Sequence, residues 1–450
     1  MRNQTIFKSG MLLWMITLLG ISATAQFKSI RIDNEPDRSG NQPTNVSVAI
    51  SRKNPDIIVA ASSSDNVYYS ADGGKTWSKS TITSRYGVGS DPVVIADFSG
   101  NFYYLHRAIL EGKSGSGETE SGRIVIHKSK DGGKTWDSGE PAGSNTSKLQ
   151  TRPWMTADRK GNFLLTWTEF DQYGSEDPEC KSAVFASKSS NGSKWSKPIK
   201  ISQYDGDCRD VNDTPRGVVP VATNDGKLFI AWSNAGYIWL DRSYNGGEFW
   251  LSNDIAITNQ TGGWNFNVPG FNQANGMPII VSDNSTGMFS GALYLVWADQ
   301  RNGEDDTDIW FSRSFNYGDN WTSPMRINND DPGNHQFMPR MCVDSGNGHI
   351  YILYYDRRDF DDNQTDVYLA YSIDNGGTFK NLKISESPFL PQPDALFSDY
   401  AGITAHQGNV IMVWTRMDEG KTSIWSSAIK MSDLEETKEA PKTGKKKGNR

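Results

Sequence analysis

Two histidines stand where they could carry acid–base chemistry. His106 lies in the segment NFYYLHRAIL and His127 in GRIVIHKSK. Both segments show the alternation and the β-branched and aromatic residues that are typical of strands. On antiparallel neighbouring strands the two rings can share one face, and an imidazole titrates near neutral pH. The competing interpretation is a pair of structural histidines whose nitrogens are satisfied within the sheet.

Two long polar segments supply further groups that could bind or react. Residues 167–174 read WTEFDQYG and include Tyr173. The second segment, residues 203–216, carries one tyrosine and two arginines of interest: Tyr204, Arg209 and Arg216. Functional residues concentrate on loops held by a rigid scaffold. The alternative is that the acids and arginines of these loops pair with one another and only order the backbone.

A repeat indicates the scaffold that positions these residues. The pattern S-x-D-x-G-x-[TS]-W is clear at 70–77 (SADGGKTW), 129–136 (SKDGGKTW) and 372–379 (SIDNGGTF), and is degenerate at 189–195, 243–250 and 314–321. A recurrence every 54 to 71 residues is typical of a repeat array. The Asp or Asn can accept hydrogen bonds from turn amides, and the glycine tolerates positive φ. We therefore expect each copy to form a tight turn between two strands.

These repeats resemble the Asp boxes of sialidases and other BNR-repeat proteins. In that family the boxes are structural and lie on the face away from the catalytic centre. Three strand-like segments accompany each unit, and this set occurs seven times, the seventh without a box after it. A fourth strand follows each box, and residues 28–33 can supply the one that the seventh unit lacks. We predict an all-β, seven-bladed propeller of four-stranded antiparallel blades, closed by the N-terminal strand.

The ends of the chain predict export. Arg2 and Lys8 precede an apolar run, and Ala23-Thr24-Ala25 is a cleavage signal, so residues 1–25 are expected to be a signal peptide cut near Ala25–Gln26. The propeller should span 26–431, and the charged stretch 432–450 should be a disordered tail. No other stretch is apolar enough for a membrane span. We expect a secreted or periplasmic monomer.

Charge and cysteines restrict the possible partners and cofactors. The net charge of −7 becomes −9 when Arg2 and Lys8 are removed, which argues against nucleic acid as a partner. Of three cysteines, Cys180 and Cys208 are the expected disulfide, with a cysteine-containing metal site as the alternative, and Cys342 is left over. No cofactor is expected to be required, although a structural calcium or zinc ion fits, for instance calcium in the acidic loop 302–306.

The fold also resembles that of the seven-bladed ulvan lyases, which act on a sulfated, uronate-containing polysaccharide. In that resemblance His106, His127 and Tyr173 would be the catalytic residues of a β-elimination. Arg209 or Arg216 would bind the uronate carboxylate, with Tyr204 as the reserve tyrosine. The first function hypothesis is therefore a polysaccharide lyase with an anionic polysaccharide as its substrate.

Two alternatives remain open at this stage. A sialidase-like glycoside hydrolase could use Glu169 or Asp171 together with Asp399. Its usual Arg-Ile-Pro motif is absent, however, and Arg31-Ile32-Asp33 is the nearest sequence. A propeller can also bind glycans or proteins without catalysis. Any ligand site is expected near the axis, on the face opposite the Asp boxes.

Overall fold

Strands fill almost all of the computed structural model of this protein. The structure describes residues 27–36, 42–63, 65–108, 123–143, 148–271 and 274–436, so the expected signal peptide lies outside the described residues. Within these ranges there is one helix, α1 (Met431–Glu436). None of the described residues forms a helix long and apolar enough to cross a membrane.

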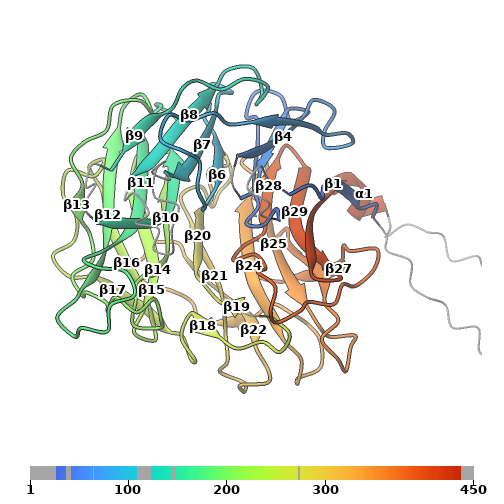
Figure 1. Cartoon of the computed structure of the whole chain (residues 1–450). Helices are drawn as coiled ribbons and strands as arrows, with labels where there is room; N and C mark the ends of the chain where they lie inside the picture. Colours follow the sequence, from blue (N-terminus) through green and yellow to red (C-terminus); the bar gives the residue numbers. More distant parts are fainter. Residues whose placement is uncertain are drawn as a thin grey trace, which may run out of the picture.

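The strands of the described residues form seven four-stranded antiparallel sheets around a common axis (Figure 1). This arrangement confirms the predicted seven-bladed propeller. Blade 1 contains β2 (Ser47–Ile50), β3 (Ile58–Ala61), β4 (Asn66–Ser70) and β5 (Ser78–Thr81). Blade 2 contains β6 (Val93–Ala96), β7 (Phe102–Arg107), β8 (Ile124–Ser129) and β9 (Glu140–Ala142). Blade 3 contains β10 (Leu149–Ala157), β11 (Phe163–Phe170), β12 (Ser182–Ser189) and β13 (Ile199–Lys200).

The second half of the ring repeats the same order and adds one small hairpin. Blade 4 contains β14 (Arg216–Ala222), β15 (Leu228–Asn234), β16 (Tyr237–Ser243) and β17 (Ile255–Asn259). Blade 5 contains β20 (Ile279–Ser282), β21 (Leu293–Asp299), β22 (Asp308–Ser314) and β23 (Met325–Arg326). Blade 6 contains β24 (Gln336–Val343), β25 (Ile350–Asp356), β26 (Asp366–Ser372) and β27 (Lys380–Lys383). Between blades 4 and 5, β18 (Asn265–Phe266) pairs with β19 (Ala274–Asn275).

The N-terminal strand closes the ring, as predicted. Blade 7 consists of β28 (Gly402–His406), β29 (Asn409–Asp418), β30 (Lys421–Lys430) and, outermost, β1 (Ile30–Asp33). The carboxylate of Asp33 accepts hydrogen bonds from the Tyr68 hydroxyl (2.5 Å) and the Lys79 ammonium (2.8 Å), both in blade 1. The first strand therefore satisfies the edge of β30 and also links the last blade to the first.

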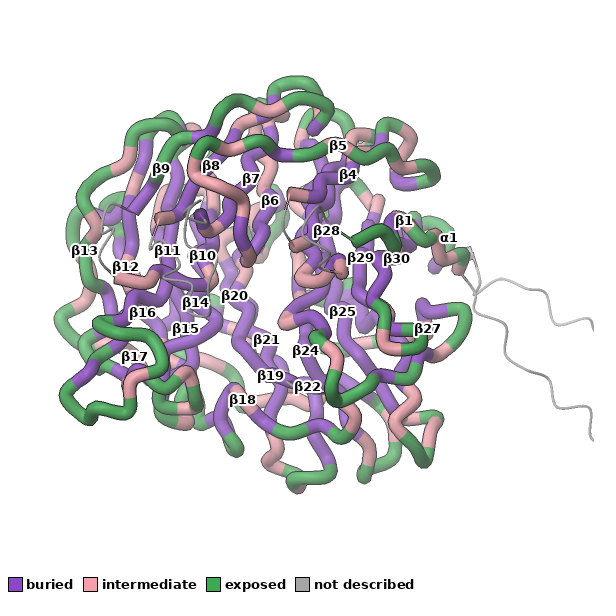
Figure 2. Tube along the Cα trace, in the orientation of Figure 1, coloured by how far each residue is buried: buried purple, intermediate pink, exposed green. Residues whose placement is uncertain are grey.

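The core lies between adjacent blades and along the innermost strands. The first strand of each blade contacts the first strands of its neighbours around the ring. Buried segments follow the inner and middle strands, whereas exposed segments gather in the loops at the rim (Figure 2). Tyr103 of blade 2 packs on Phe163 of blade 3, with ring centroids 4.8 Å apart. Loops at the inner-strand ends are thus held on a rigid frame.

The turns between the third and fourth strands have the predicted hydrogen bonds. The Asp72 carboxylate accepts from the amides of Lys75 and Thr76 (3.0 Å each) and from the Thr76 hydroxyl (2.6 Å). These hydrogen bonds, led by those from Thr76, lower the pKa of Asp72 to about 2. Gly73 and Gly74 have φ of 76° and 84°, which a side chain would disfavour.

The chain leaves blade 7 through α1. Leu434 of this helix is buried and packs on the main core. The stretch that the sequence assigned to a disordered tail therefore begins in a packed helix through residue 436, and residues 437–450 lie outside the described residues.

Candidate functional site

The inner strands begin in an unusual backbone conformation on the face opposite the turns just described. Five of them have, among the described residues, one with positive φ just before the strand or within its first four residues: Asn45 (51°), Asp91 (60°), Arg152 (49°), Gly217 (67°) and Met338 (52°). The strand register shifts across Arg152 in blade 3, Gly217 in blade 4 and Met338 in blade 6. A residue other than glycine persists at positive φ only where its surroundings hold it. The surroundings are most heavily charged at Arg152.

Arg152 is surrounded by carboxylates from three other parts of the ring. Its guanidinium lies 3.2 Å from Asp399, which precedes blade 7, and its backbone amide donates to Asp91, at the entrance of blade 2 (3.1 Å). Burial opposes the charge, but Asp399, Asp210 and Asp91 raise the pKa of Arg152 above its ordinary value. Arg152 therefore remains cationic at the mouth of the axis.

A second arginine lies beside the first and is tied to a tyrosine. Arg216, which is 1% exposed, donates to Asp210 through Nε (2.6 Å) and to the Thr151 hydroxyl (2.6 Å). The other oxygen of Asp210 accepts from the Tyr173 hydroxyl (2.9 Å). Burial alone would raise the pKa of Asp210, but the positive charges of Arg216 and Arg152 lower it. Arg216, Asp210 and Tyr173 therefore form a connected chain from the buried interior to the surface.

Tyr173 is the exposed end of this chain. Its side chain is 50% exposed, and its ring meets that of Phe170 edge-on. Partial burial and the charge of Asp210 raise the pKa of Tyr173, with Arg216 and Arg152 opposing. The hydroxyl is therefore protonated at neutral pH, and it donates its proton to the hydrogen bond with Asp210.

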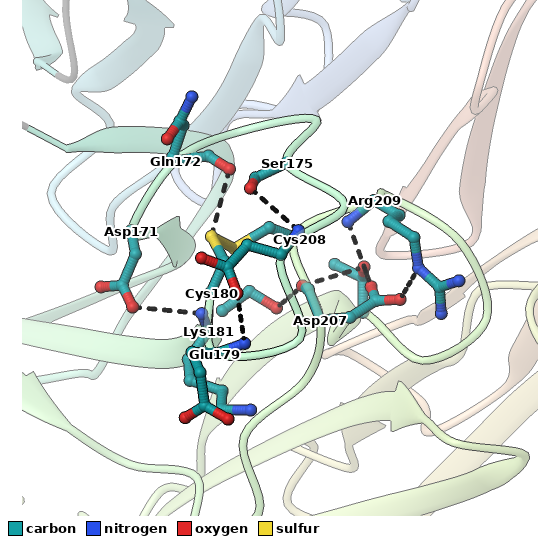
Figure 3. The surroundings of a disulfide bond; sticks show 12 residues. Asp171, Gln172, Ser175, Glu179, Cys180, Lys181, Asp207, Cys208 and Arg209 are labelled. Carbon is teal, nitrogen blue, oxygen red and sulfur yellow. Dashed lines mark hydrogen bonds and ion pairs between the residues drawn. A yellow bond between two sulfur atoms is a disulfide. The ribbon is translucent and has the colours of Figure 1, made fainter.

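A disulfide holds the loops that carry Tyr173 and Asp210. Cys180, in the loop from β11 to β12, is bonded to Cys208, in the loop from β13 to β14 (Figure 3). This confirms the predicted pairing and excludes the alternative cysteine-containing metal site at these two residues. The backbone amide of Gly174 also donates to the Cys208 carbonyl (2.7 Å). The two loops thus form one unit on the predicted face.

The other two residues assigned to binding have different neighbours. Tyr204 is exposed and packs on Trp239 of β16, with ring centroids 5.0 Å apart. Arg209 is exposed and pairs with Asp207 (2.6 Å). No hydrogen bond or ion pair joins either side chain to Arg152 or Arg216 among the described residues. The structure therefore brings together Tyr173 and Arg216, but not Tyr204 and Arg209.

His106 and His127 do meet, but inside the protein. Their Nε2 atoms are 3.1 Å apart, and the Nδ1 atoms lie 2.7 Å and 2.9 Å from the carbonyl oxygens of Arg107 and Asp137. Both side chains are fully buried. Burial is the main cause that lowers the pKa of each ring, to about 3 for His106. Each ring nitrogen lies within hydrogen-bond distance of another group, but two neutral rings carry two protons and can make only two of these three contacts as hydrogen bonds. Neither ring has a surface that a substrate could contact.

The carboxylates considered for hydrolysis are also separated. Glu169 is buried and accepts from Gln150 (3.1 Å) and from the Trp167 indole (3.3 Å). Asp171 pairs with Lys148 on the outer surface (2.6 Å). Of the three named candidates, Asp399 alone pairs with Arg152. Asp91 and Asp210 complete the acidic groups around that arginine.

No metal centre is formed by the part of the chain that the structure describes. No group of three or more His, Cys, Asp or Glu side chains in these residues is arranged to hold an ion, and this includes the acidic loop 302–306. Cys342 is a free thiol, the leftover cysteine that the sequence predicted.

The role of Asp91 was missed by sequence reasoning, and so was the link between Asp210 and Tyr173. A signal was present, because three of the residues with positive φ precede a proline at the start of an inner strand: Asp91-Pro92, Arg152-Pro153 and Met338-Pro339. A residue followed by proline thus recurs in three inner-strand segments, and two of these residues, Asp91 and Arg152, contact each other.

Comparisons with known proteins support the architecture. No family model matches the chain. The photosystem II assembly lipoprotein Ycf48 of Synechococcus sp. (strain CC9902) is 24% identical over 203 residues, which are 42% of this chain and 56% of that protein. The match thus spans little more than half of that relative's length.

Two solved structures have the same fold over nearly their whole length. A PL25 ulvan lyase matches with a TM-score of 0.51 and 11% identity, over 88% of this chain and 98% of that one. The α-L-arabinofuranosidase Arb93A from Fusarium graminearum matches with a TM-score of 0.50 and 12% identity, over 91% and 99%. At these identities the likeness shows the shared propeller fold.

Proposed function

We propose that this protein is a secreted carbohydrate-active enzyme, a lyase that cleaves a uronate-containing sulfated polysaccharide by β-elimination. The observation that carries the proposal is the exposed, protonated Tyr173 hydroxyl, linked through Asp210 to two arginines at the axial mouth. The fold shared with a PL25 ulvan lyase supports it. The disulfide is consistent with an oxidising, extracellular location.

β-Elimination needs a proton removed at C5 of the uronate, charge stabilisation on its carboxylate, and a proton for the leaving oxygen. Tyr173 can deliver the last of these, since its raised pKa keeps the hydroxyl protonated. Arg152 and Arg216 lie behind it, each paired with a carboxylate, and their remaining guanidinium donors would stabilise charge that develops on the uronate carboxylate. The C5 proton would be accepted by His106 or His127, the assigned proton-transfer residues, which requires the sheet to open around them, so variants of both belong in the test.

The test is absorbance at 235 nm, where an unsaturated uronate absorbs, with ulvan and other uronate polysaccharides as substrates. We expect the wild type to produce a rise and Tyr173→Phe to lower the rate by about 10²-fold or more, because general acid catalysis contributes that much. Tyr244→Phe is the matched control, since Tyr244 is 51% exposed and lies on a turn of the opposite face. His106→Ala and His127→Ala complete the set.

Equal rates for Tyr173→Phe and the wild type would contradict the assigned role of Tyr173. A rise that only the histidine variants abolish would return the catalytic centre to blade 2. No rise with any substrate would contradict the lyase proposal.

A glycoside hydrolase is the second candidate, favoured by the carboxylates of Asp91, Asp210 and Asp399 around Arg152. The fold shared with an arabinofuranosidase is compatible with it. Reducing ends that appear without absorbance at 235 nm, and that disappear in Asp399→Asn, would support hydrolysis. Saturable binding with neither product would support a non-catalytic glycan-binding propeller.

A further inference from the structure

The propeller axis contains a cavity lined by the inner strands of all seven blades. It has a volume of about 190 Å³, and its wall is largely aliphatic, with Val48, Val94 and Ile280 among the residues that line it. A second cavity of about 220 Å³ shares part of this wall and extends towards the opposite face. The axis is therefore a channel with both polar and apolar surface in its wall rather than a filled core.

One cation in the first cavity has no partner. Arg340 of β24 lines the cavity, and its Cζ lies 3.8 Å from the centroid of the Trp154 ring. Its Nη1 is buried without a hydrogen-bond partner, and the guanidinium forms no ion pair with any described residue. A guanidinium has five N–H donors, and stacking on an indole satisfies none of them. Arg152 and Arg216 nearby are paired with carboxylates, so Arg340 differs from them.

The described lining of the channel includes cations but no acid. No aspartate or glutamate is among the described residues that line either cavity. At the far end Arg52 lines the second cavity and donates to the Ser345 hydroxyl (2.7 Å). Burial lowers the pKa of Arg340 to about 10, which still leaves it cationic at neutral pH. A buried charge that lacks a protein partner is stabilised strongly by a counterion.

We propose that the axial cavity binds a small oxyanion, a carboxylate or sulfate group, on the guanidinium of Arg340. The planar fork of arginine suits two oxygens of such a group, and Trp154 holds the fork in place from one side. The cavity has room for the group together with several water molecules. The oxyanion is either free in solution or a substituent of a polysaccharide that enters from the Arg152 side.

The site is tested by thermal unfolding of the full mature protein in sodium sulfate, with sodium chloride added to keep the ionic strength constant. We expect the wild-type Tm to rise saturably by about 2 °C, since a ligand that binds only the folded state stabilises it. Arg340→Met removes the charge while keeping most of the volume, and should lose this response. It should also melt no lower than the wild type without sulfate, because an unpaired buried charge is gone.

Sulfate stabilises proteins generally by exclusion from their surfaces, so the response is read as a difference between variants. Arg416→Met is the matched control, because Arg416 pairs with Asp418 in blade 7 and does not line the channel. It should keep the saturable rise. An equal response in the wild type and Arg340→Met, or a response without saturation, would overturn the proposal.

A crystal soak in selenate provides a second readout that does not depend on the variant folding. An anomalous peak within hydrogen-bond distance of the Arg340 guanidinium supports the site, and an empty cavity at saturating selenate overturns it. Ulvan oligosaccharides then identify the source of the oxyanion. Loss of the sulfate response in their presence indicates a polysaccharide substituent, whereas an unchanged response indicates a free anion. Neither readout requires lyase activity.

Discussion

The histidine pair shows what residue types and spacing can and cannot establish. The alternating pattern of the two segments predicted neighbouring strands that place His106 and His127 on one face, and in the structure their ring centroids are 5.3 Å apart. Their burial comes from the packing of blade 2 against blade 1, where Tyr104 of the same strand joins the core cluster that includes Val59. Contact between blades is a tertiary effect that no local pattern encodes.

The pair should make the folded state sensitive to acid. The pKa of His106 is about 3 in the folded protein, against 6.5 ordinarily, and that of His127 is also lowered. Below pH 6.5 the unfolded chain therefore binds protons that the folded chain does not, so stability is complete above this pH and is lost towards pH 3. His106 alone should remove about 2 kcal/mol between pH 7.5 and 5.

Urea unfolding at pH 7.5 and pH 5 measures this loss. The double variant His106→Leu/His127→Leu should show a smaller drop in unfolding free energy between the two pH values than the wild type. The same drop in both proteins would mean that other groups cause the acid sensitivity.

The elements were predictable because their turns repeat. Six turns share the serine, the acid or its amide, the glycine and the aromatic residue, whereas the three-strand set recurs seven times and predicted the number of blades. The missing fourth strand of the seventh unit pointed to β1. The hairpin of β18 and β19 was not predicted, because two-residue strands leave no periodic pattern. The contacts of Asp91 and Asp399 with Arg152 were not predicted either, since both acids lie far from Arg152 in the sequence.

The turn acids should stabilise the blades measurably. Asp72→Ala removes an acceptor of four hydrogen bonds and should lower the unfolding free energy by about 1–2 kcal/mol. Asp72→Asn should cost less, because the natural Asn191 accepts two turn amides in blade 3. Urea unfolding at pH 7 distinguishes the variants. An alanine variant as stable as the wild type would show that the glycines alone define the turn.

Across the whole molecule, charge is distributed unevenly. The chain has a net charge of −7, yet Arg52 and Arg340 line a channel without acids among its described lining residues. An acidic protein can still take up an anion through such a local cationic field. This cationic field depends on the closed ring, because each inner strand contributes only a few of the residues that line the channel.

The central claim is that ligands bind at the axial mouth and not at the turn face. Hydrogen–deuterium exchange of the mature protein with and without ulvan oligosaccharides tests it most directly. We expect slower exchange in the two disulfide-linked loops, residues 171–181 and 201–215, with unchanged exchange in the turns at 72–77 and 131–136. Protection confined to those turns, or no protection anywhere at saturating oligosaccharide, would contradict it.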